Sequence, residues 1–354
     1  MNESPKLILV LGAGASFGAR CELLEPTPPL GDRLASYLLK WLDANDPGRL
    51  SPLERMIAED SLDASYPDPD IWRLGHLEEV NQLLAKIKRE GGFEATLNEL
   101  LEQPGSWGTL TDLNRIISVA FLGGEGCAFE PNADRYDELL KEIGSQLCAV
   151  ITPNYDLLFE EALERAGTVF FLAGVEAEVG LPLFKIHGSV DWMQVKGHAS
   201  SATLEVAVAN STPTRFVDQE GVGLSVETEV MYIPEGRKNL WLTLKDLQHK
   251  PPLLATYGRG KPSTHERVRL ERVRDQARYF VEQHANANVV MIGLRPPEDD
   301  VDDPTWAALC REMAQTTGKK TYVSPVAVEC DKMRTLGFRS VEATLEEFLK
   351  RDSS

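Results

Sequence analysis

Cysteine is scarce in this sequence, and its few cysteines are scattered. The 354 residues include 5 cysteines, none of which forms a C-x-x-C pair with another. This pattern excludes a structural zinc site of the usual spacing and is typical of reduced thiols in a cytoplasm. We therefore expect a cytoplasmic protein without a bound metal.

Basic residues and long apolar runs are also in short supply. The chain has 37 basic against 55 acidic residues, a formal net charge of -18. Because proteins displace phosphate counterions with Lys and Arg, this balance argues against direct nucleic-acid binding. No apolar run approaches the roughly 20 residues that span a bilayer, so we expect no membrane contact. A signal peptide is disfavoured, since the acidic Glu3 lies in the region where a signal peptide carries positive charge.

Short apolar runs separated by helical patterns predict the fold class. Four runs are typical of buried parallel strands: Lys6–Leu11, Leu147–Thr152, Asn288–Gly293 and Lys320–Ser324. Strands that alternate with amphipathic helices favour an α/β fold with a doubly wound, mostly parallel, Rossmann-like sheet. We expect a helix to open at Ser16, the run at 320–324 to be the last strand, and 340–351 to form a closing helix.

The sequence pattern predicts one domain, residues 1–354, with two insertions. Helical patterns fill approximately 30–146, including one at 51–62, and predict a helical insertion or subdomain. A Val- and Thr-rich stretch at approximately 198–250 predicts an irregular, β-rich insertion. The helical insertion is our candidate for an oligomer interface or a lid.

Ligands of open parallel sheets bind beyond the carboxyl ends of the strands, so the loops there are informative. They read GAGAS (12–16), TPNYD (152–156), KIHGSVDW (185–192) and GLRPPEDD (293–300). In the first loop, Gly12, Gly14 and Gly18 miss the dinucleotide fingerprint G-x-G-x-x-G by one residue, and the acidic second strand of dehydrogenases is missing. Its amides could bind a phosphate, or its glycines could serve only a structural turn.

The other loops carry polar side chains, and each of these allows a structural and a functional interpretation. Asn154 and Asp156 either cap the helix that follows, or Asn154 faces a ligand while Asp156 holds the loop. His187 comes at the end of a predicted strand. This position favours a role as an acid–base group or ligand contact over that of an ordinary core or surface residue. The acids at 298–303 match no metal-loop spacing and are typical of a solvated turn.

In their order, GAGAS, TPNYD, KIHGS and VVMIG resemble the sirtuin-like superfamily, and more narrowly a divergent bacterial branch found in antiviral defence. The resemblance runs from residue 12 to near 324. It implies that Asn154 and His187 are catalytic. It implies that eight further residues bind NAD: Gly12, Ala13, Gly14, Ser16, Thr152, Asp156, Gly293 and Ser324. Ser324 stands where sirtuins often carry an Asn that contacts the adenosine ribose.

The resemblance implies NAD as the substrate, and one departure from the family narrows the reaction. Deacylase sirtuins carry a zinc ribbon with two C-x-x-C pairs after the HG motif, whereas residues 187–300 contain no cysteine. The sequence therefore favours hydrolysis of NAD⁺ to nicotinamide and ADP-ribose without a metal, depleting NAD in antiphage defence by abortive infection. Two alternatives stay open: a sensor or structural module that binds NAD or ADP-ribose without turnover, and a zinc-less NAD-dependent deacylase.

Control of such an activity is expected from outside the catalytic site. A constitutively active NAD hydrolase would kill its host, so we expect regulation by homo-oligomerisation or by a separately encoded defence partner. The resemblance implies a partner of the ATPase, nuclease or Argonaute type. The sequence predicts neither the activating trigger nor the oligomeric state.

Overall fold

A computed structural model shows two compact units. Unit 1 consists of residues 1–30, 128–190 and 254–354, and unit 2 of residues 31–127 and 191–253. The structure describes residues 6–19, 33–44, 77–101, 107–122, 134–173, 179–195, 229–231, 252–254, 264–297 and 304–352. The predicted insertions at 30–146 and 198–250 stay predictions. The pattern at 51–62, the acids at 298–303 and most of 198–250 lie outside the described residues.

Unit 1 is built on a seven-stranded sheet whose strand order is β10-β9-β8-β1-β2-β4-β3. The strands are β1 (Leu7–Leu11), β2 (Leu147–Thr152), β3 (Phe170–Leu172), β4 (Leu181–Lys185), β8 (Asn288–Ile292), β9 (Lys320–Ser324) and β10 (Arg339–Glu342). Every pair of neighbours in this sheet is parallel. The predicted doubly wound α/β class is therefore confirmed.

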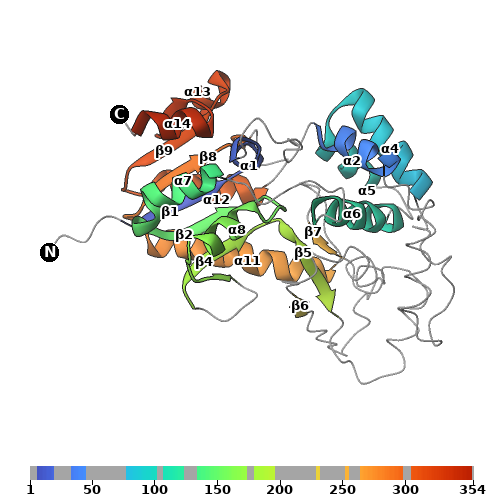
Figure 1. Ribbon diagram of the computed structural model, residues 1–354, viewed down its shortest axis with the longest axis horizontal. Helices are drawn as coiled ribbons and strands as arrows, with labels where there is room; N and C mark the ends of the chain where they lie inside the picture. Colours follow the sequence, from blue (N-terminus) through green and yellow to red (C-terminus); the bar gives the residue numbers. More distant parts are fainter. Residues whose placement is uncertain are drawn as a thin grey trace. The chain divides into compact units, whose positions relative to one another are not determined.

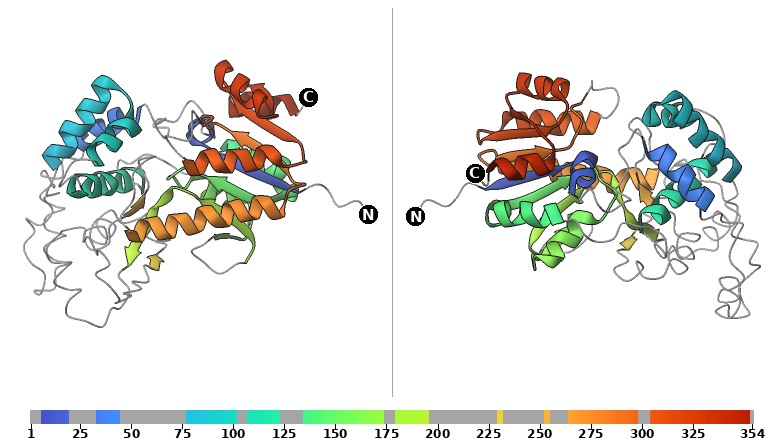
Figure 2. Two further views of the ribbon diagram at one scale, coloured as in Figure 1. Left: turned by 180° about the vertical axis from the view of Figure 1, so that it is seen from behind. Right: turned by 45° about the horizontal axis from the view of Figure 1, so that its top comes forward.

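Helices cover both faces of this sheet (Figures 1 and 2). They are α1 (Ala13–Ala19), α7 (Asp134–Ile143), α8 (Leu158–Arg165), α11 (Thr264–Gln283), α12 (Pro304–Gln315), α13 (Ala327–Thr335) and α14 (Leu345–Asp352). Helices α7 and α8 pack together on one face, and α11 and α12 pack together on the other. No helix in the described part of the chain is long and apolar enough to cross a membrane.

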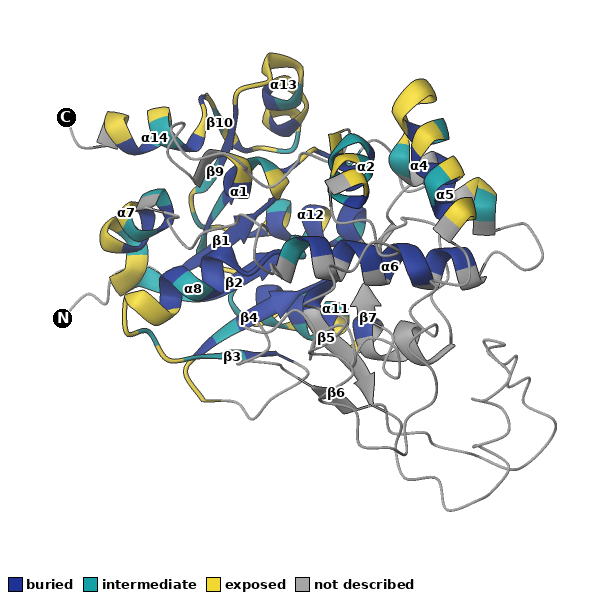
Figure 3. Cartoon of the chain, turned by 45° about the vertical axis from the view of Figure 1, so that its right-hand side comes forward, coloured by how far each residue is buried: buried dark blue, intermediate teal, exposed yellow. Residues whose placement is uncertain are grey.

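Strand β1 lies at the centre of the core. All five of its residues are buried (Figure 3). Leu9 pairs with Val150 of β2 on one side and with Val290 of β8 on the other. A parallel strand covered on both faces has to be apolar throughout, which explains the sequence LILVL. The pairing brings the carboxyl ends of β1, β2 and β8 to one edge, called the carboxyl edge below.

The direction in which the sheet grows reverses at β1. The chain first adds β2, β3 and β4 on one side of β1, and later adds β8, β9 and β10 on the other. Open α/β sheets bind ligands outside the carboxyl ends of the strands at such a switch point. The fold therefore directs attention to the loops that follow β1, β2, β4 and β8.

Two predicted elements differ from the observed ones. Helix α1 begins at Ala13 rather than at Ser16, because the turn at Gly12 already directs the chain into the helix. The predicted closing helix at 340–351 is wrong in its first part. Residues Arg339–Glu342 form β10, a further strand paired with β9, and only α14 is helical.

Unit 2 contains a cluster of helices and a small sheet. The helices are α2 (Leu34–Ala44), α4 (Leu77–Glu90), α5 (Phe93–Leu101) and α6 (Trp107–Leu122). Helices α2, α4 and α6 contact one another and bury Leu38, Leu84 and Leu113. A three-stranded sheet has the order β6-β5-β7, with β5 (Gly188–Val195), β6 (Glu229–Met231) and β7 (Pro252–Leu254).

Candidate functional site

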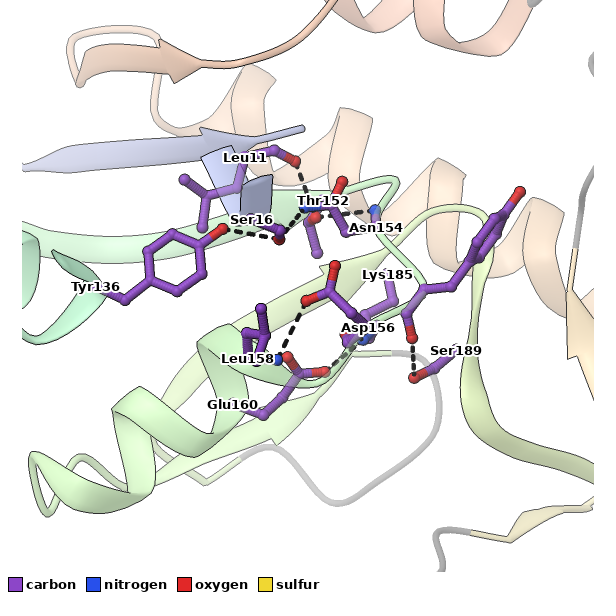
Figure 4. Close-up of polar contacts among 11 residues, drawn as sticks. Leu11, Ser16, Tyr136, Thr152, Asn154, Asp156, Leu158, Glu160, Lys185 and Ser189 are labelled. Atoms are coloured by element: carbon purple, nitrogen blue, oxygen red, sulfur yellow. Dashed lines mark hydrogen bonds and ion pairs between the residues drawn. The ribbon is translucent and has the colours of Figure 1, made fainter. Parts of the chain in front are cut away.

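The loop after β2 is hydrogen-bonded to the loop after β1 (Figure 4). The Thr152 hydroxyl donates to the Leu11 carbonyl at 2.9 Å and accepts from the Asn154 amide at 3.0 Å. The Asn154 side-chain nitrogen Nδ2 donates to the Gly12 carbonyl and to Ser16 Oγ, both at 2.9 Å. These bonds fix Asn154, which is partly exposed, at the switch point.

The carboxamide of Asn154 has a defined orientation. A carbonyl oxygen can only accept, so the group that faces the Gly12 carbonyl has to be the NH₂ group of Asn154. Both protons of Nδ2 are used, on Gly12 and on Ser16. The oxygen Oδ1 accepts no hydrogen bond from the described residues. Asn154 can therefore offer a hydrogen-bond acceptor to a ligand at the carboxyl edge.

Ser16 connects Asn154 to a buried tyrosine. Its hydroxyl lies 2.9 Å from the Tyr136 hydroxyl, and both residues are buried. Tyr136 comes from α7, and its ring packs edge-to-face on Phe159 with centroids 5.1 Å apart. Asn154, Ser16 and Tyr136 therefore form a continuous chain of hydrogen bonds from the partly exposed loop to the buried side chain of α7.

His187 lies in the turn that follows β4, and β4 is the strand next to β2 in the sheet. The turn is held to the β2 loop by backbone bonds: the Ile186 amide donates to the Thr152 carbonyl at 3.0 Å, and the Val190 amide to the Tyr155 carbonyl at 3.1 Å. The His187 ring is partly exposed, with its centroid 6.5 Å from that of Tyr155. The structure thus brings the predicted TPNYD and KIHGS loops together.

The loop after β8 packs backbone to backbone against the loop after β1. The Gly12 amide donates to the Ile292 carbonyl and the Gly14 amide to the Gly293 carbonyl, both at 2.9 Å. A Cβ at Gly12 would lie 2.4 Å from the Gly293 oxygen. The glycines of GAGAS therefore serve this close approach, and two of the amides predicted to hold a phosphate are already used within the protein.

Substitution of Gly293 tests this packing. Gly293 has φ +65°, and an alanine Cβ there would lie 2.1 Å from the Ala15 nitrogen. Gly167 has nearly the same φ, +66°, but open space around it. Gly167→Ala should cost about 1–2 kcal/mol for the left-handed backbone. Gly293→Ala should cost about 1–3 kcal/mol more because the backbone has to shift. Equal losses in urea unfolding would contradict the packing role.

Three charged side chains are buried beneath Asn154. Lys185 Nζ donates to Glu160 Oε1 at 2.5 Å and to the Asp156 backbone carbonyl at 2.7 Å. Lys185 is fully buried, and Glu160 and Asp156 nearly so. The Asp156 carboxylate also accepts the Leu158 amide at 3.1 Å, so it takes one of the free amides of α8. Asp156 therefore holds the loop and the helix start, whereas Asn154 caps nothing.

Burial shifts the pKa of two groups in this cluster. Burial raises the pKa of Asp156 above its ordinary value of 3.8, and the negative Glu160 raises it further, while the Lys185 ammonium opposes the rise. Burial also raises the pKa of Tyr136 well above 10, with a contribution from the negative Asp156. Tyr136 accordingly keeps its proton at neutral pH.

The raised pKa of Asp156 predicts a pH-dependent difference between the wild type and Asp156→Asn. The native state binds the Asp156 proton more tightly than the unfolded state, so this carboxyl stabilises the fold most below pH 3.8. That contribution is lost as the pH rises through the raised pKa. The amide oxygen of the variant can still accept the hydrogen bond from the Leu158 amide. Unfolding at several pH values should show Asp156→Asn gaining stability relative to wild type as the pH rises; a constant difference would contradict the shift.

Ser324 is buried at the end of β9 and is engaged with its own turn. Its hydroxyl donates to Glu329 Oε2 at 2.6 Å and accepts from the Val326 amide at 3.2 Å. The predicted ribose contact of Ser324 stays a prediction, since no described bond joins it to the residues around Asn154. Sequence reasoning overlooked Tyr136, Glu160 and Lys185. A lysine inside the apolar run LPLFKI was the available signal for the last of them.

A metal-binding cluster is not visible in the described ranges. There, no group of three or more His, Cys, Asp or Glu side chains is arranged to hold an ion. What the edge does offer is an acceptor oxygen on Asn154, an imidazole on His187 and the amide of Ala13. These groups are suited to orienting hydroxyls or water and to moving a proton.

Comparisons with known proteins give limited information. No family model and no curated protein matches the chain. A structure from a study of the mechanism and regulation of Sir2 enzymes is 14% identical, with a TM-score of 0.38, over 99% of this chain and 90% of that one. A Sir2 homologue in complex with ADP-ribose is 13% identical, with a TM-score of 0.36, over 99% and 90%. Values this low support no argument about function, so the fold class rests on the strand order.

Proposed function

We propose that this protein hydrolyses NAD⁺ at the bond between nicotinamide and ribose. The observation that carries the proposal is the orientation of the Asn154 carboxamide. Its Nδ2 donates hydrogen bonds to the Gly12 carbonyl and to Ser16 Oγ. Its Oδ1 is thereby presented as an acceptor at the switch point, and His187 lies in the turn after the neighbouring strand β4. An acceptor and a base on adjacent loops are the groups needed to orient and deprotonate a water molecule or a ribose hydroxyl.

In the proposed reaction the glycosidic bond breaks with its electron pair moving to the nicotinamide nitrogen. The positive pyridinium ring leaves as neutral nicotinamide, through a transition state that resembles an oxocarbenium ion. The oxygen of water bonds to the ribose carbon, and His187 takes the proton and passes it to solvent. The balance is NAD⁺ and water giving nicotinamide, ADP-ribose and a proton. A neutral leaving group needs no metal to stabilise it.

The other predicted residues would hold the dinucleotide. Gly12, Ala13, Gly14 and Ser16 would face the diphosphate, with the Ala13 amide as a donor. Thr152 and Asp156 would keep the β2 loop in place, as their bonds to Leu11 and Leu158 suggest. Gly293 would also contact the dinucleotide, and Ser324 would lie toward the adenosine ribose. These assignments rest on the motif resemblance.

The biological role that we propose is depletion of NAD in antiphage defence. It rests on the resemblance of the four motifs to the bacterial defence branch, as does control by a homo-oligomer or by an ATPase, nuclease or Argonaute-type partner. Mass measurement of the purified chain, alone and with the product of a neighbouring gene, tests this control. A monomer that binds no such partner would contradict it.

Product analysis distinguishes this function from its rivals. Purified protein is incubated with NAD⁺, with and without an acetyl-lysine peptide, and the products are separated by chromatography. Equal amounts of nicotinamide and ADP-ribose without the peptide support the hydrolase. Nicotinamide that appears only with the peptide, together with acetylated ADP-ribose, indicates a deacylase. Binding of ADP-ribose without any nicotinamide release indicates a sensor.

A further inference from the structure

The loop predicted to bind the diphosphate offers few free donors. The Gly12 and Gly14 amides donate to the Ile292 and Gly293 carbonyls, and the Ala15 amide donates back to the Gly12 carbonyl at 2.9 Å. The Ala13 amide has no such acceptor among the described residues. A diphosphate carries negative charge, and the net charge of -18 on the chain opposes its approach. A cation outside GAGAS would therefore favour the binding of such a ligand.

Arg295 follows directly on the loop that packs against GAGAS. The Gly293 carbonyl accepts from the Gly14 amide, and Leu294 lies against Gly12. The Arg295 side chain is 72% exposed, and its ion pair with Glu329 is 3.9 Å long, beyond hydrogen-bond range. In contrast, Lys185 at the end of β4 is buried and paired with Glu160. Among the described residues, Arg295 is thus a weakly paired cation beside the switch point.

The backbone that carries Arg295 is held firmly. The Tyr322 hydroxyl donates to the Leu294 carbonyl at 2.5 Å, and the Trp306 indole donates to the Arg295 carbonyl at 3.2 Å. The Gly293 amide donates to the Val323 carbonyl at 3.0 Å. Only the side chain of Arg295 would have to be ordered on binding, which limits the entropic cost.

We propose that Arg295 binds the phosphates of the dinucleotide in place of the Gly12 and Gly14 amides. Its guanidinium would leave Glu329 and donate in parallel to two phosphate oxygens, a geometry that Arg offers and Lys does not. The proposal names the phosphate-binding residue of the site described above and so rests on the proposed function for the identity of the ligand.

Direct binding measurements test this role. Titration of the full chain with ADP-ribose should give a dissociation constant about 10- to 100-fold higher for Arg295→Ala than for wild type, as expected for loss of a charge-assisted pair. Arg295→Lys should fall in between. Affinity should also depend less on salt in Arg295→Ala. Arg334→Ala is the matched control, because Arg334 is an exposed arginine paired with Asp331 on α13 and should leave binding unchanged.

The outcomes separate the two proposals. Unchanged ADP-ribose affinity in Arg295→Ala, or an equal loss in Arg334→Ala, overturns the Arg295 assignment while NAD⁺ hydrolysis by the wild type can still stand. Arg295-dependent binding without nicotinamide release overturns the hydrolase and leaves the assignment intact. A wild-type chain that binds no ADP-ribose and releases no nicotinamide from NAD⁺ overturns both.

Discussion

Replacing His187 by alanine is expected to slow nicotinamide release from NAD⁺ by about 10²–10⁴-fold, the range lost when a general base is removed. The ring is partly exposed in the turn after β4, so its loss should leave the fold intact. His187→Gln keeps a polar side chain but not a base, and it should be slowed to a similar extent. Initial rates at saturating NAD⁺ measure both effects.

A histidine outside the site provides the control for this experiment. His284 directly follows α11, and its ring stacks on Phe280 with centroids 4.0 Å apart. His284→Ala should leave the rate of nicotinamide release unchanged. Full activity in His187→Gln would show that hydrogen bonding alone suffices, and would contradict the role of His187 as a base.

The second large effect concerns stability rather than rate. Lys185→Met leaves Glu160 without its buried partner and the Asp156 carbonyl without its donor. We expect the free energy of unfolding to fall by about 3–5 kcal/mol, as for other buried pairs that lose one member. The double variant Lys185→Met, Glu160→Leu removes both charges and should recover part of the loss. Urea unfolding measures all of these changes.

An exposed ion pair of similar length gives the matched control. Lys350 donates to Glu346 at 2.6 Å on α14, with the lysine side chain 72% exposed. Lys350→Met should cost at most about 1 kcal/mol, because water already solvates both charges. A loss in Lys185→Met as small as that in Lys350→Met would mean that the buried pair contributes little to the fold around Asn154.

Much of the fold could be predicted because the buried strands are apolar throughout. The predicted bounds of β2 and β9 are the observed ones. Strand β10 was not predicted because its sequence, RSVE, has no apolar run. Its residues are half-buried or exposed. It forms because β9 offers a free parallel edge, a property of the folded sheet rather than of the segment.

The sequence predicted which loops lie together at the candidate site, but not how their side chains are oriented. The loops after β1, β2 and β4 were correctly expected to meet, since parallel strands end at one edge. The orientation of Asn154 depends on Gly12 and Ser16, which are 142 and 138 residues away in the chain. The glycines alone do not distinguish a ligand loop from a tight turn, because Gly12 and Gly14 pack closely against Gly293 whether or not a ligand binds.

The most direct measurement of the central claim compares the products of NAD⁺ formed by the wild type and by the double variant Asn154→Ala, His187→Ala. Both proteins should bind ADP-ribose. The wild type, with any activating partner present, should release nicotinamide and ADP-ribose in equal amounts, and the double variant should release neither above background. Nicotinamide release by the double variant at the wild-type rate would contradict the account.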